Sequence, residues 1–228
     1  MIAALLDFIS PRPCRLCGKR LSLYEQEICT ACNLHLPRTH YEETPFDNNL
    51  SRLFWGRFNV DRVAALYFYE AHCDSSRLIY DLKYHGKREL GQWLGTLAAE
   101  EFTAFNFFDA IDFIVPVPVT WRRRWKRGYN QSEVIAHGVA EVTGLPVRRK
   151  LLKRVHFKCS QTKLSLSERL RNAEGAFAVR SREDISGSHV LIVDDVVTTG
   201  ATVSSCAKEL EKAGAEKISV LSIGCTKI

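Results

Sequence analysis

From residue 61 onward, short apolar runs alternate with longer segments whose apolar residues recur at helical spacing. The apolar runs predict β-strands at residues 63–69, 111–117, 190–193 and 218–223. The segments between them predict helices at residues 76–84, 90–105, 132–142 and 201–212. Apolar strands separated by helices are typical of a parallel sheet that is covered on both faces. The pattern therefore predicts an α/β fold, with a parallel sheet flanked by helices.

The first 60 residues have a different character. Four cysteines cluster before residue 40, whereas a Glu-Glu-Thr-Pro sequence and a pair of asparagines interrupt any periodicity between residues 41 and 60. A chain of 228 residues is long enough for one domain with a small additional module. We therefore expect a module at residues 1–40, a linker at residues 41–60 and a main domain at residues 61–228.

The clustered cysteines form two Cys-x-x-Cys pairs separated by eleven residues: Cys14, Cys17, Cys29 and Cys32. In a cytosolic chain, such pairs favour a metal site over disulfides. The spacing and the glycine after the first pair are typical of a Cys₄ zinc ribbon, with an iron site of the rubredoxin type as the alternative. Four thiolates leave no open coordination position, so we expect Zn²⁺ here to be structural.

Positive charge is concentrated in one part of the chain. Residues 120–172 carry fourteen Lys and Arg against three Asp and Glu, whereas the net charge of the whole chain is only +6. We expect this segment to meet phosphate groups, with a merely solvated surface as the alternative. No apolar run approaches the ~20 residues of a membrane helix, and the first residues lack the basic start of a signal peptide. We therefore expect a cytoplasmic protein without membrane insertion.

The apolar run at residues 190–193 leads directly into Asp194 and Asp195. Ligands of open α/β sheets bind beyond the carboxyl ends of the strands. Gly200 allows backbone N–H groups to approach an anion, and the helix that follows supplies further donors. Three hydroxyls can add to this anion site, those of Thr198, Thr199 and Thr202. Paired carboxylates beside it suit a phosphorylated sugar with vicinal hydroxyls and a nearby Mg²⁺; the alternative is an ordinary Asp-capped turn.

This segment resembles the signature with which type I phosphoribosyltransferases bind PRPP (5-phosphoribosyl-1-pyrophosphate). The signature consists of an apolar strand, Asp-Asp, two further residues, and Thr-Thr-Gly-x-Thr before a helix. The resemblance implies a type I phosphoribosyltransferase-like sheet, here with a small N-terminal zinc-ribbon module. It implies that Asp194 and Asp195 face the ribose 2- and 3-hydroxyls, with Mg²⁺ bound alongside PRPP. It assigns the 5-phosphate to Thr198, Thr199, Gly200, Ala201 and Thr202.

Further segments resemble the ComF competence family and its GntX-type relatives. They are the entry into the cysteine module at residues 8–14, the sequence Leu82-Lys83-Tyr84-His85-Gly86, and the Pro-Val-Pro run at residues 114–118 with Arg127-Gly128-Tyr129-Asn130-Gln131. This resemblance implies a PRPP-binding protein that handles incoming single-stranded DNA in natural transformation. It also implies work in the cytoplasm beside a helicase-like DNA translocase.

From the Pro-Val-Pro run onward, the chain is also similar to glutamine–PRPP amidotransferase, although it lacks that enzyme's glutaminase domain. In this fold the loop after the Pro-Val-Pro strand faces the pyrophosphate, and the candidates here are Arg123, Arg124, Lys126 and Arg127. Arg127 is favoured because Gly128 follows it and permits close approach. A flexible loop at residues 150–172 is expected to cover bound PRPP, and the similarity places in it Gln161, Arg169 and Asn172.

Aromatic residues alternate with cations between residues 121 and 129. Aromatic platforms beside cations are what proteins use to bind single-stranded DNA without sequence preference. The candidates for such contacts are Trp121, Arg122, Trp125 and Tyr129. In the alternative, Trp121 and Trp125 pack against the sheet and the arginines bind only pyrophosphate. The ComF resemblance favours DNA.

Two functions therefore remain open. The first is a PRPP-binding, DNA-handling protein of the ComF type. The second is an active phosphoribosyltransferase that transfers ribose 5-phosphate from PRPP to an unidentified nitrogen acceptor in nucleotide metabolism. Only a few residues follow the last predicted strand, so we expect no C-terminal hood to hold a base. We prefer the first function and assign no catalytic residue.

Overall fold

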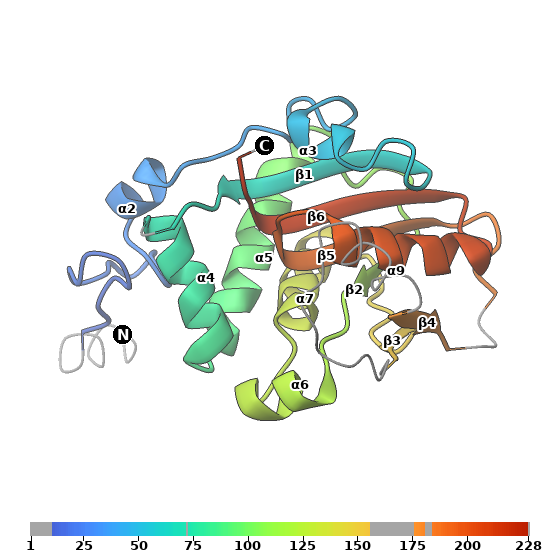
Figure 1. The fold of residues 1–228 in the computed structure, drawn as a ribbon. Helices are drawn as coiled ribbons and strands as arrows, with labels where there is room; N and C mark the ends of the chain where they lie inside the picture. Colours follow the sequence, from blue (N-terminus) through green and yellow to red (C-terminus); the bar gives the residue numbers. More distant parts are fainter. Residues whose placement is uncertain (1–10, 72, 156–175, 181–183, 228) are drawn as a thin grey trace.

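A four-stranded parallel sheet forms the centre of the computed structural model, which describes residues 11–71, 73–155, 176–180 and 184–227 (Figure 1). The strand order is β1–β6–β5–β2, with the bounds Val60–Phe68, Lys217–Cys225, His189–Val197 and Phe113–Pro116. Val190 of β5 pairs with Ile218 of β6 on one side and with Phe113 of β2 on the other. The predicted parallel sheet is confirmed, and each of its four strands lies where an apolar run predicted one.

Both faces of the sheet are covered. The helices α4, α5 and α7 pack on one face, with the bounds Asp74–Tyr84, Arg88–Thr103 and Gln131–Thr143. The other face carries α9, the short helix α3 and the hairpin β3–β4, with the bounds Ala201–Lys212, Asn49–Arg52, Leu152–Arg154 and Phe177–Val179. Along β5, Leu191 contacts the first layer and Ile192 the second, so neither side of the strand is polar. The four predicted helices are confirmed to within a few residues at their ends.

The helix α6, Trp121–Arg127, was not predicted. In the structure Thr120 caps the helix by accepting a hydrogen bond from the N–H of Arg123, at 3.2 Å. Gly128 ends it in the left-handed conformation, with φ at 79°. No residue of α6 is buried, and its seven residues include only two apolar side chains, Trp121 and Trp125. A pattern this short does not predict a helix.

Residues 41–60, where we expected a linker, are packed onto the sheet. The helix α3 begins with a capping box between Asn48 and Ser51. The Asn48 amide also donates to the carbonyl of Val63 in β1, at 2.9 Å. Leu50 and Phe54 are fully buried. The segment is thus part of the second face's core, and the division into three units stays a proposal.

The N-terminal module lies against α4, α5 and β1 (Figure 1). Its own helix, α2, spans Thr30–His35. Arg38 forms an ion pair with Glu101 of α5, with 2.7 Å between Nη2 and Oε1. Its guanidinium also lies 5.0 Å from the ring centroid of Tyr67 in β1. The apolar side chains of the module belong to the same core as α4 and α5: Leu16, Leu21, Ile28 and Leu36.

The helices of the described residues also bear on the membrane question. Within the described ranges, no helix is both long enough and apolar enough to cross a membrane.

Gly95 of α5 and Gly138 of α7 allow the two helices to approach closely, and Gly138 gives a first prediction. A Cβ atom on Gly138 would lie 2.0 Å from the backbone oxygen of Gln92. We expect Gly138→Ala to lower the free energy of unfolding by about 1–3 kcal/mol, because the two helices must separate. Urea unfolding measures this change. His137→Ala, at an exposed position of the same helix, serves as the control; an unchanged midpoint for Gly138→Ala would contradict the prediction.

Candidate functional site

The paired carboxylates lie inside β5, near its carboxyl end, because the strand continues beyond them to Val197. Asp194 is buried, with 8% of its surface exposed. Its Oδ1 accepts hydrogen bonds from the Ser132 hydroxyl at 3.0 Å and from the N–H of Asp195 at 2.9 Å. Burial and the neighbouring Asp195 charge raise the pKa of Asp194 to about 7, against these hydrogen bonds. The site therefore holds a carboxyl group that is poised between its two protonation states near neutral pH.

Asp195 is held by a cation that the sequence analysis left without a role. The ammonium group of Lys83 lies 3.3 Å from Oδ2 of Asp195. Lys83 stands at the end of α4, more than a hundred residues earlier in the chain. Lys83 belongs to the Leu82–Gly86 motif, which resembles the ComF family and could have drawn attention to this residue. The motif alone did not show that α4 packs so as to bring Lys83 to Asp195. The structure thus adds Lys83 to the candidate site.

The turn after β5 has the form of an anion site. Thr198 and Thr199 are exposed, and Gly200 leads into α9 in the left-handed conformation, with φ at 70°. The N-cap residue Gly200 has no side chain that could cap the first N–H groups of α9, which suits them to bind an anion. A Cβ on Gly200 would lie 2.7 Å from the ring of Phe54, so glycine is required here by packing as well. Arg57, which the sequence analysis did not single out, donates to the Thr199 carbonyl at 3.1 Å.

Ala201 and Thr202, the other two predicted contacts to the 5-phosphate, form the first turn of α9 and are partly exposed. They follow Gly200 directly, so the structure brings the whole predicted phosphate segment together at one end of the sheet. The short path along β5 from Asp195 to Thr198 keeps the carboxylates beside it. The arrangement suits a ligand that carries a phosphate a few ångströms from a pair of hydroxyls.

Of the four pyrophosphate candidates on α6, Arg127 is connected to the carboxylates. Its Nη1 donates to Oε1 of Gln131 at 2.8 Å. The hydroxyl of the next residue, Ser132, donates a hydrogen bond to Oδ1 of Asp194. The amide nitrogen of Gln131 is buried without a partner among the described residues. Such a donor is suited to a bound polar ligand. Gly128, by contrast, ends α6 in the left-handed conformation, and among the described residues beyond its two chain neighbours nothing lies within 4 Å of where its Cβ would be.

The other three pyrophosphate candidates, Arg123, Arg124 and Lys126, are exposed on α6. Arg124 and Arg149 approach the same carboxylate, that of Glu133, with N–O distances of 3.9 Å and 3.4 Å. Burial and the charge of Arg123 lower the pKa of Arg154, which is half-buried at the end of β3. The sequence analysis did not select Arg154, because its burial depends on the β3–β4 hairpin. The α6 cations thus face a second set of cations from another part of the chain.

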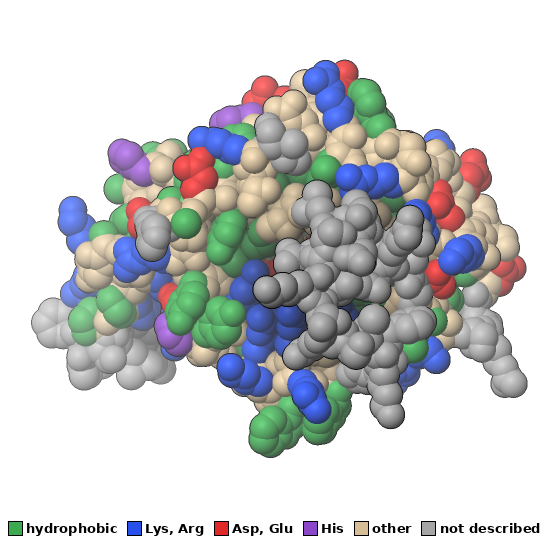
Figure 2. All heavy atoms as spheres, viewed as in Figure 1, with side chains coloured by type: hydrophobic (Ala, Val, Ile, Leu, Met, Phe, Trp, Pro, Cys, Tyr) green, Lys and Arg blue, Asp and Glu red, His purple; other side chains and the backbone are tan. Residues whose placement is uncertain are grey.

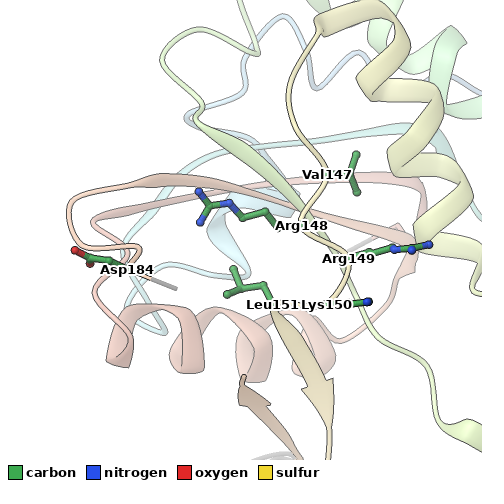
Figure 3. A pocket seen from close by; sticks show the side chains of 6 residues that line it. All are labelled: Val147, Arg148, Arg149, Lys150, Leu151 and Asp184. Atoms are coloured by element: carbon green, nitrogen blue, oxygen red, sulfur yellow. The ribbon is translucent and has the colours of Figure 1, made fainter. Parts of the chain in front are cut away.

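Two adjoining cavities lie along these cations. One, of about 370 Å³, is lined by α6 and the β3 hairpin, and its cations are Arg124, Arg149, Lys150, Lys153, Arg154 and Arg180. The other, of about 640 Å³, is drawn in Figure 3 and shares Arg149 and Lys150 with the first. Figure 3 shows Arg148 pointing to the opposite side of the segment from Arg149. The guanidinium of Arg148 lies 3.9 Å from the ring centroid of Phe113. These surfaces favour anionic ligands.

The DNA-contact candidates separate into two groups. Trp121 and Trp125 are 68% and 80% exposed, and Arg122 is exposed beside them. The alternative in which the two tryptophans pack against the sheet is therefore wrong. Figure 2 shows hydrophobic side chains at the tip of the molecule formed by α6, with Lys and Arg side chains next to them. Tyr129 differs from the prediction, because its ring is buried and its hydroxyl donates to the carbonyl of Leu82.

The predicted loop residues Gln161, Arg169 and Asn172 lie outside the described residues.

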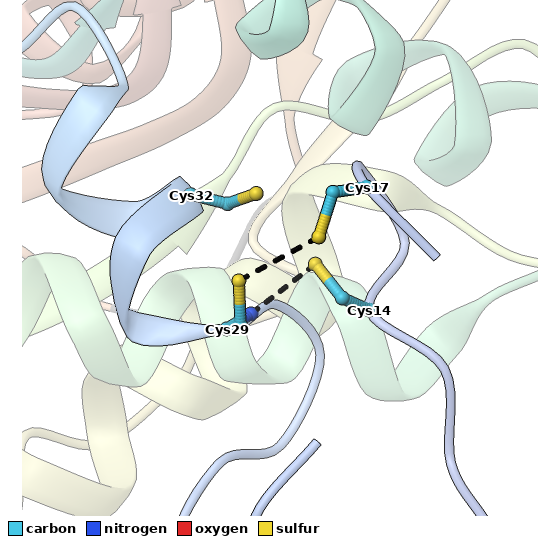
Figure 4. Close-up of side chains that lie close together, drawn as sticks. All are labelled: Cys14, Cys17, Cys29 and Cys32. Atoms are coloured by element: carbon cyan, nitrogen blue, oxygen red, sulfur yellow. Dashed lines mark hydrogen bonds between the residues drawn. The ribbon is translucent and has the colours of Figure 1, made fainter. Parts of the chain in front are cut away.

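The four clustered cysteines point toward one another in the N-terminal module (Figure 4). Their Sγ atoms all lie within 4.8 Å of one another, and those of Cys17 and Cys29 are 3.7 Å apart. Tetrahedral Zn–S bonds of ~2.3 Å require sulfur atoms about 3.8 Å apart, so the donor set fits a zinc ion. Burial raises the pKa of the Cys14 thiol, but backbone N–H groups, including that of Cys29 at 3.2 Å, lower it to about 6. The cluster can therefore bind a metal such as zinc.

Comparison with known proteins places the chain in a family. Residues 126–224 match the model of the phosphoribosyl transferase domain. The competence protein F of Haemophilus influenzae is 30% identical over 216 residues, which cover 91% of this chain and 82% of that protein. The DNA utilization protein YhgH of Escherichia coli K12 is 30% identical over 220 residues, covering 92% and 95%. The competence protein ComFC of Streptococcus pneumoniae is 32% identical over 141 residues, covering 62% and 59%.

Among solved structures, the glutamine PRPP amidotransferase of B. subtilis is similar with a TM-score of 0.41 and 22% identity. The similar part covers 64% of this chain and 30% of that one. The matched phosphoribosyl transferase domain contains β5, the Asp pair and the turn into α9. The matches to the Haemophilus and Escherichia proteins each cover more than nine tenths of this chain. This chain therefore belongs to the competence protein F (ComF) family and contains a phosphoribosyl transferase domain.

Proposed function

We propose that the protein binds PRPP with Mg²⁺ at the Asp194–Asp195 site and handles incoming single-stranded DNA in natural transformation. One observation carries the proposal. The cationic helix α6 is connected to the carboxylates through Arg127, Gln131 and Ser132, so one short segment of chain joins the two binding regions. A ligand at the carboxylates is thereby placed to influence contacts made by α6.

For PRPP, the residues present fit the ligand. Asp194 and Asp195 offer oxygen atoms to vicinal hydroxyls and to Mg²⁺, which prefers such ligands. The open N–H groups at the start of α9 suit the 5-phosphate, and Arg127 suits the pyrophosphate. The bound metal would supply charge neutralisation between the carboxylates and the pyrophosphate. These assignments rest on the family's domain together with the positions of the side chains.

For DNA, exposed cations and two exposed tryptophans occupy one helix. Guanidinium groups neutralise backbone phosphates, while indole faces stack on bases. The names of the relatives connect them with competence and DNA utilization. In keeping with the family, we propose a cytoplasmic protein that contains structural Zn²⁺ and works beside a helicase-like DNA translocase.

The test is fluorescence anisotropy of a short oligothymidylate, titrated with protein at several salt concentrations, with and without Mg²⁺ and PRPP. We expect affinity to fall steeply with salt, since log K falls by about 0.7 per log unit of salt for each phosphate contact to a single strand. The triple variant Arg122→Ala, Arg123→Ala, Arg124→Ala should reduce that slope by about 2. PRPP is expected to change the affinity of the wild-type protein.

The control removes three cations from elsewhere on the surface: Lys212→Ala, Lys217→Ala and Lys227→Ala. It should leave the slope unchanged, apart from a small effect of net charge. Absence of binding at low salt, or equal slopes for both triple variants, would contradict the assignment of α6 to DNA. Pyrophosphate release from PRPP that depends on an added nitrogen base would instead identify an active phosphoribosyltransferase.

A further inference from the structure

A loop from the segment that we expected to be a linker packs against the turn before α9. A Cβ atom at Gly200 would lie 2.7 Å from the ring of Phe54 and 3.0 Å from Leu53, so both side chains contact the turn. The Phe54 ring is fully buried, and its centroid lies 5.4 Å from that of Phe58, which is also buried. Two buried rings therefore hold both ends of the short loop between them in place beside the turn.

Arg57 lies in this loop and donates from its Nη1 to the carbonyl of Thr199, at 3.1 Å. Its own backbone N–H donates to the carbonyl of Phe54, at 2.9 Å. The side chain is partly buried, and no carboxylate of the described residues forms an ion pair with it. A guanidinium group has several N–H donors, so one bond to a carbonyl leaves both its charge and further donors available. An unpaired cation beside an anion-binding turn is suited to a negatively charged ligand.

The bond from Arg57 also fixes the direction of the peptide group between Thr199 and Gly200. The peptide bonds of the described residues are trans, so the C=O and N–H of one peptide group point in opposite directions. Because the carbonyl of Thr199 points toward Arg57, the N–H of Gly200 points away from it. Among the backbone hydrogen bonds of residues 184–227, none has this N–H as its donor. It comes directly before the N–H groups of the first turn of α9, where the helix dipole favours an anion.

We propose that Arg57 is a positioning residue for the 5-phosphate of a bound sugar phosphate. It holds the peptide before α9 in the orientation that presents the Gly200 N–H to the phosphate, and it adds a positive charge behind the turn. The inference rests on the proposed function, because the phosphate concerned is that of PRPP. It also extends the site to a residue far outside the matched phosphoribosyl transferase domain, residues 126–224.

This role predicts that Arg57 affects one end of the ligand only. The 5-phosphate is assigned to the turn that Arg57 contacts, whereas the pyrophosphate is assigned to Arg127 on α6. Removing Arg57 should therefore weaken ligands that carry a 5-phosphate and leave the binding of pyrophosphate alone nearly unchanged. A merely structural role would instead weaken all of these ligands together, because a disturbed sheet end affects the whole site.

The experiment is titration calorimetry with Mg²⁺ and three ligands, which are PRPP, ribose 5-phosphate and inorganic pyrophosphate. We expect Arg57→Ala to raise the Kd of PRPP and of ribose 5-phosphate by at least about five-fold, as the loss of one hydrogen bond with its charge implies. Arg57→Lys should recover most of this loss, since an ammonium group keeps the charge and can donate to the Thr199 carbonyl. Arg52→Ala is the control, because this exposed arginine forms its ion pair with Asp47 instead.

Unchanged affinity of Arg57→Ala for both sugar phosphates would overturn the inference. An equal loss for pyrophosphate, or an Arg57→Lys variant as weak as Arg57→Ala, would overturn it as well. If the wild-type protein does not bind PRPP, the proposed function fails, but ribose 5-phosphate still tests Arg57 because it requires only the sugar and phosphate contacts. If wild-type protein binds neither sugar phosphate, both the proposed function and the role of Arg57 are wrong.

Discussion

Replacing Cys14 by serine is expected to remove zinc from the purified protein and to unfold the N-terminal module. Cys14 is the most deeply buried of the four cysteines, with 2% of its surface exposed. Its Sγ accepts a hydrogen bond from the backbone of Cys29, so it fixes the second Cys pair as well as offering a ligand. A structural zinc contributes an apparent ~10–16 kcal/mol to the folding of small modules. No other interaction in residues 11–40 approaches that magnitude.

The measurement combines metal analysis with limited proteolysis. Wild-type protein should contain one zinc per chain, and Cys14→Ser should contain far less and be cleaved within residues 11–40. Cys73→Ser is the matched control, because Cys73 is a partly exposed cysteine outside the cluster. Full zinc content in Cys14→Ser would refute the Cys₄ assignment. Iron in place of zinc would settle the alternative that the spacing left open.

Loss of the module should also disturb the main domain. Leu16 and Ile28 belong to the same core as Leu78 and Leu82 of α4. Arg77 of α4 donates to the carbonyl of Leu16, at 3.2 Å. Helix α4 carries Lys83, so the metal cluster supports the carboxylate site indirectly through the position of this helix. A zinc-free protein is therefore expected to bind PRPP more weakly as well.

Much of the fold could be predicted because its strands are buried on both faces. Residues 190–193 of β5 are apolar and fully buried, and such a run predicts a strand without knowledge of its neighbours. The Asp pair and the glycine turn could be predicted as well, since they come after this apolar run in the sequence. Helix α6 was not predicted because it has only seven residues and buries none of them, so its two tryptophans form too short a pattern to indicate a helix.

The errors and omissions at the site have a common cause, which is contact between distant segments. Lys83 and Asp195 are more than a hundred residues apart, and only the packing of α4 on the sheet brings them together. Tyr129 looked like a stacking platform from its spacing, but its hydroxyl reaches the carbonyl of Leu82 and draws the ring into the core. Likewise, the Pro and Asn residues that indicated a linker instead form a cap and tight turns that place Phe54 under Gly200.

The double change Asp194→Asn with Asp195→Asn is expected to weaken PRPP binding by about two orders of magnitude or more. Each charge-assisted hydrogen bond contributes about 1.5–3 kcal/mol, and a tenfold change in Kd corresponds to about 1.4 kcal/mol. The fold should survive, since asparagine can still accept from Ser132. Titration calorimetry with Mg²⁺ and PRPP measures the loss. The control is Asp47→Asn with Asp74→Asn, which changes two exposed carboxylates. If both double variants bind PRPP with the same affinity, Asp194 and Asp195 do not bind PRPP.

The same carboxyl makes binding depend on pH, and the direction follows from its surroundings. Burial and the Asp195 charge raise the pKa of Asp194 to about 7 from 3.8, while Lys83 and the Ser132 hydroxyl oppose them. The folded protein therefore binds more protons than the unfolded chain between these values, so Asp194 costs stability progressively as pH rises toward about 7. A bound ribose and Mg²⁺ require the ionised form, so binding must release a proton below that pH. Affinity should fall as pH drops below about 7, and less so in Asp194→Asn. Because the titration of the PRPP phosphates is common to both proteins, a parallel fall in the two would assign the whole effect to the ligand and none to Asp194.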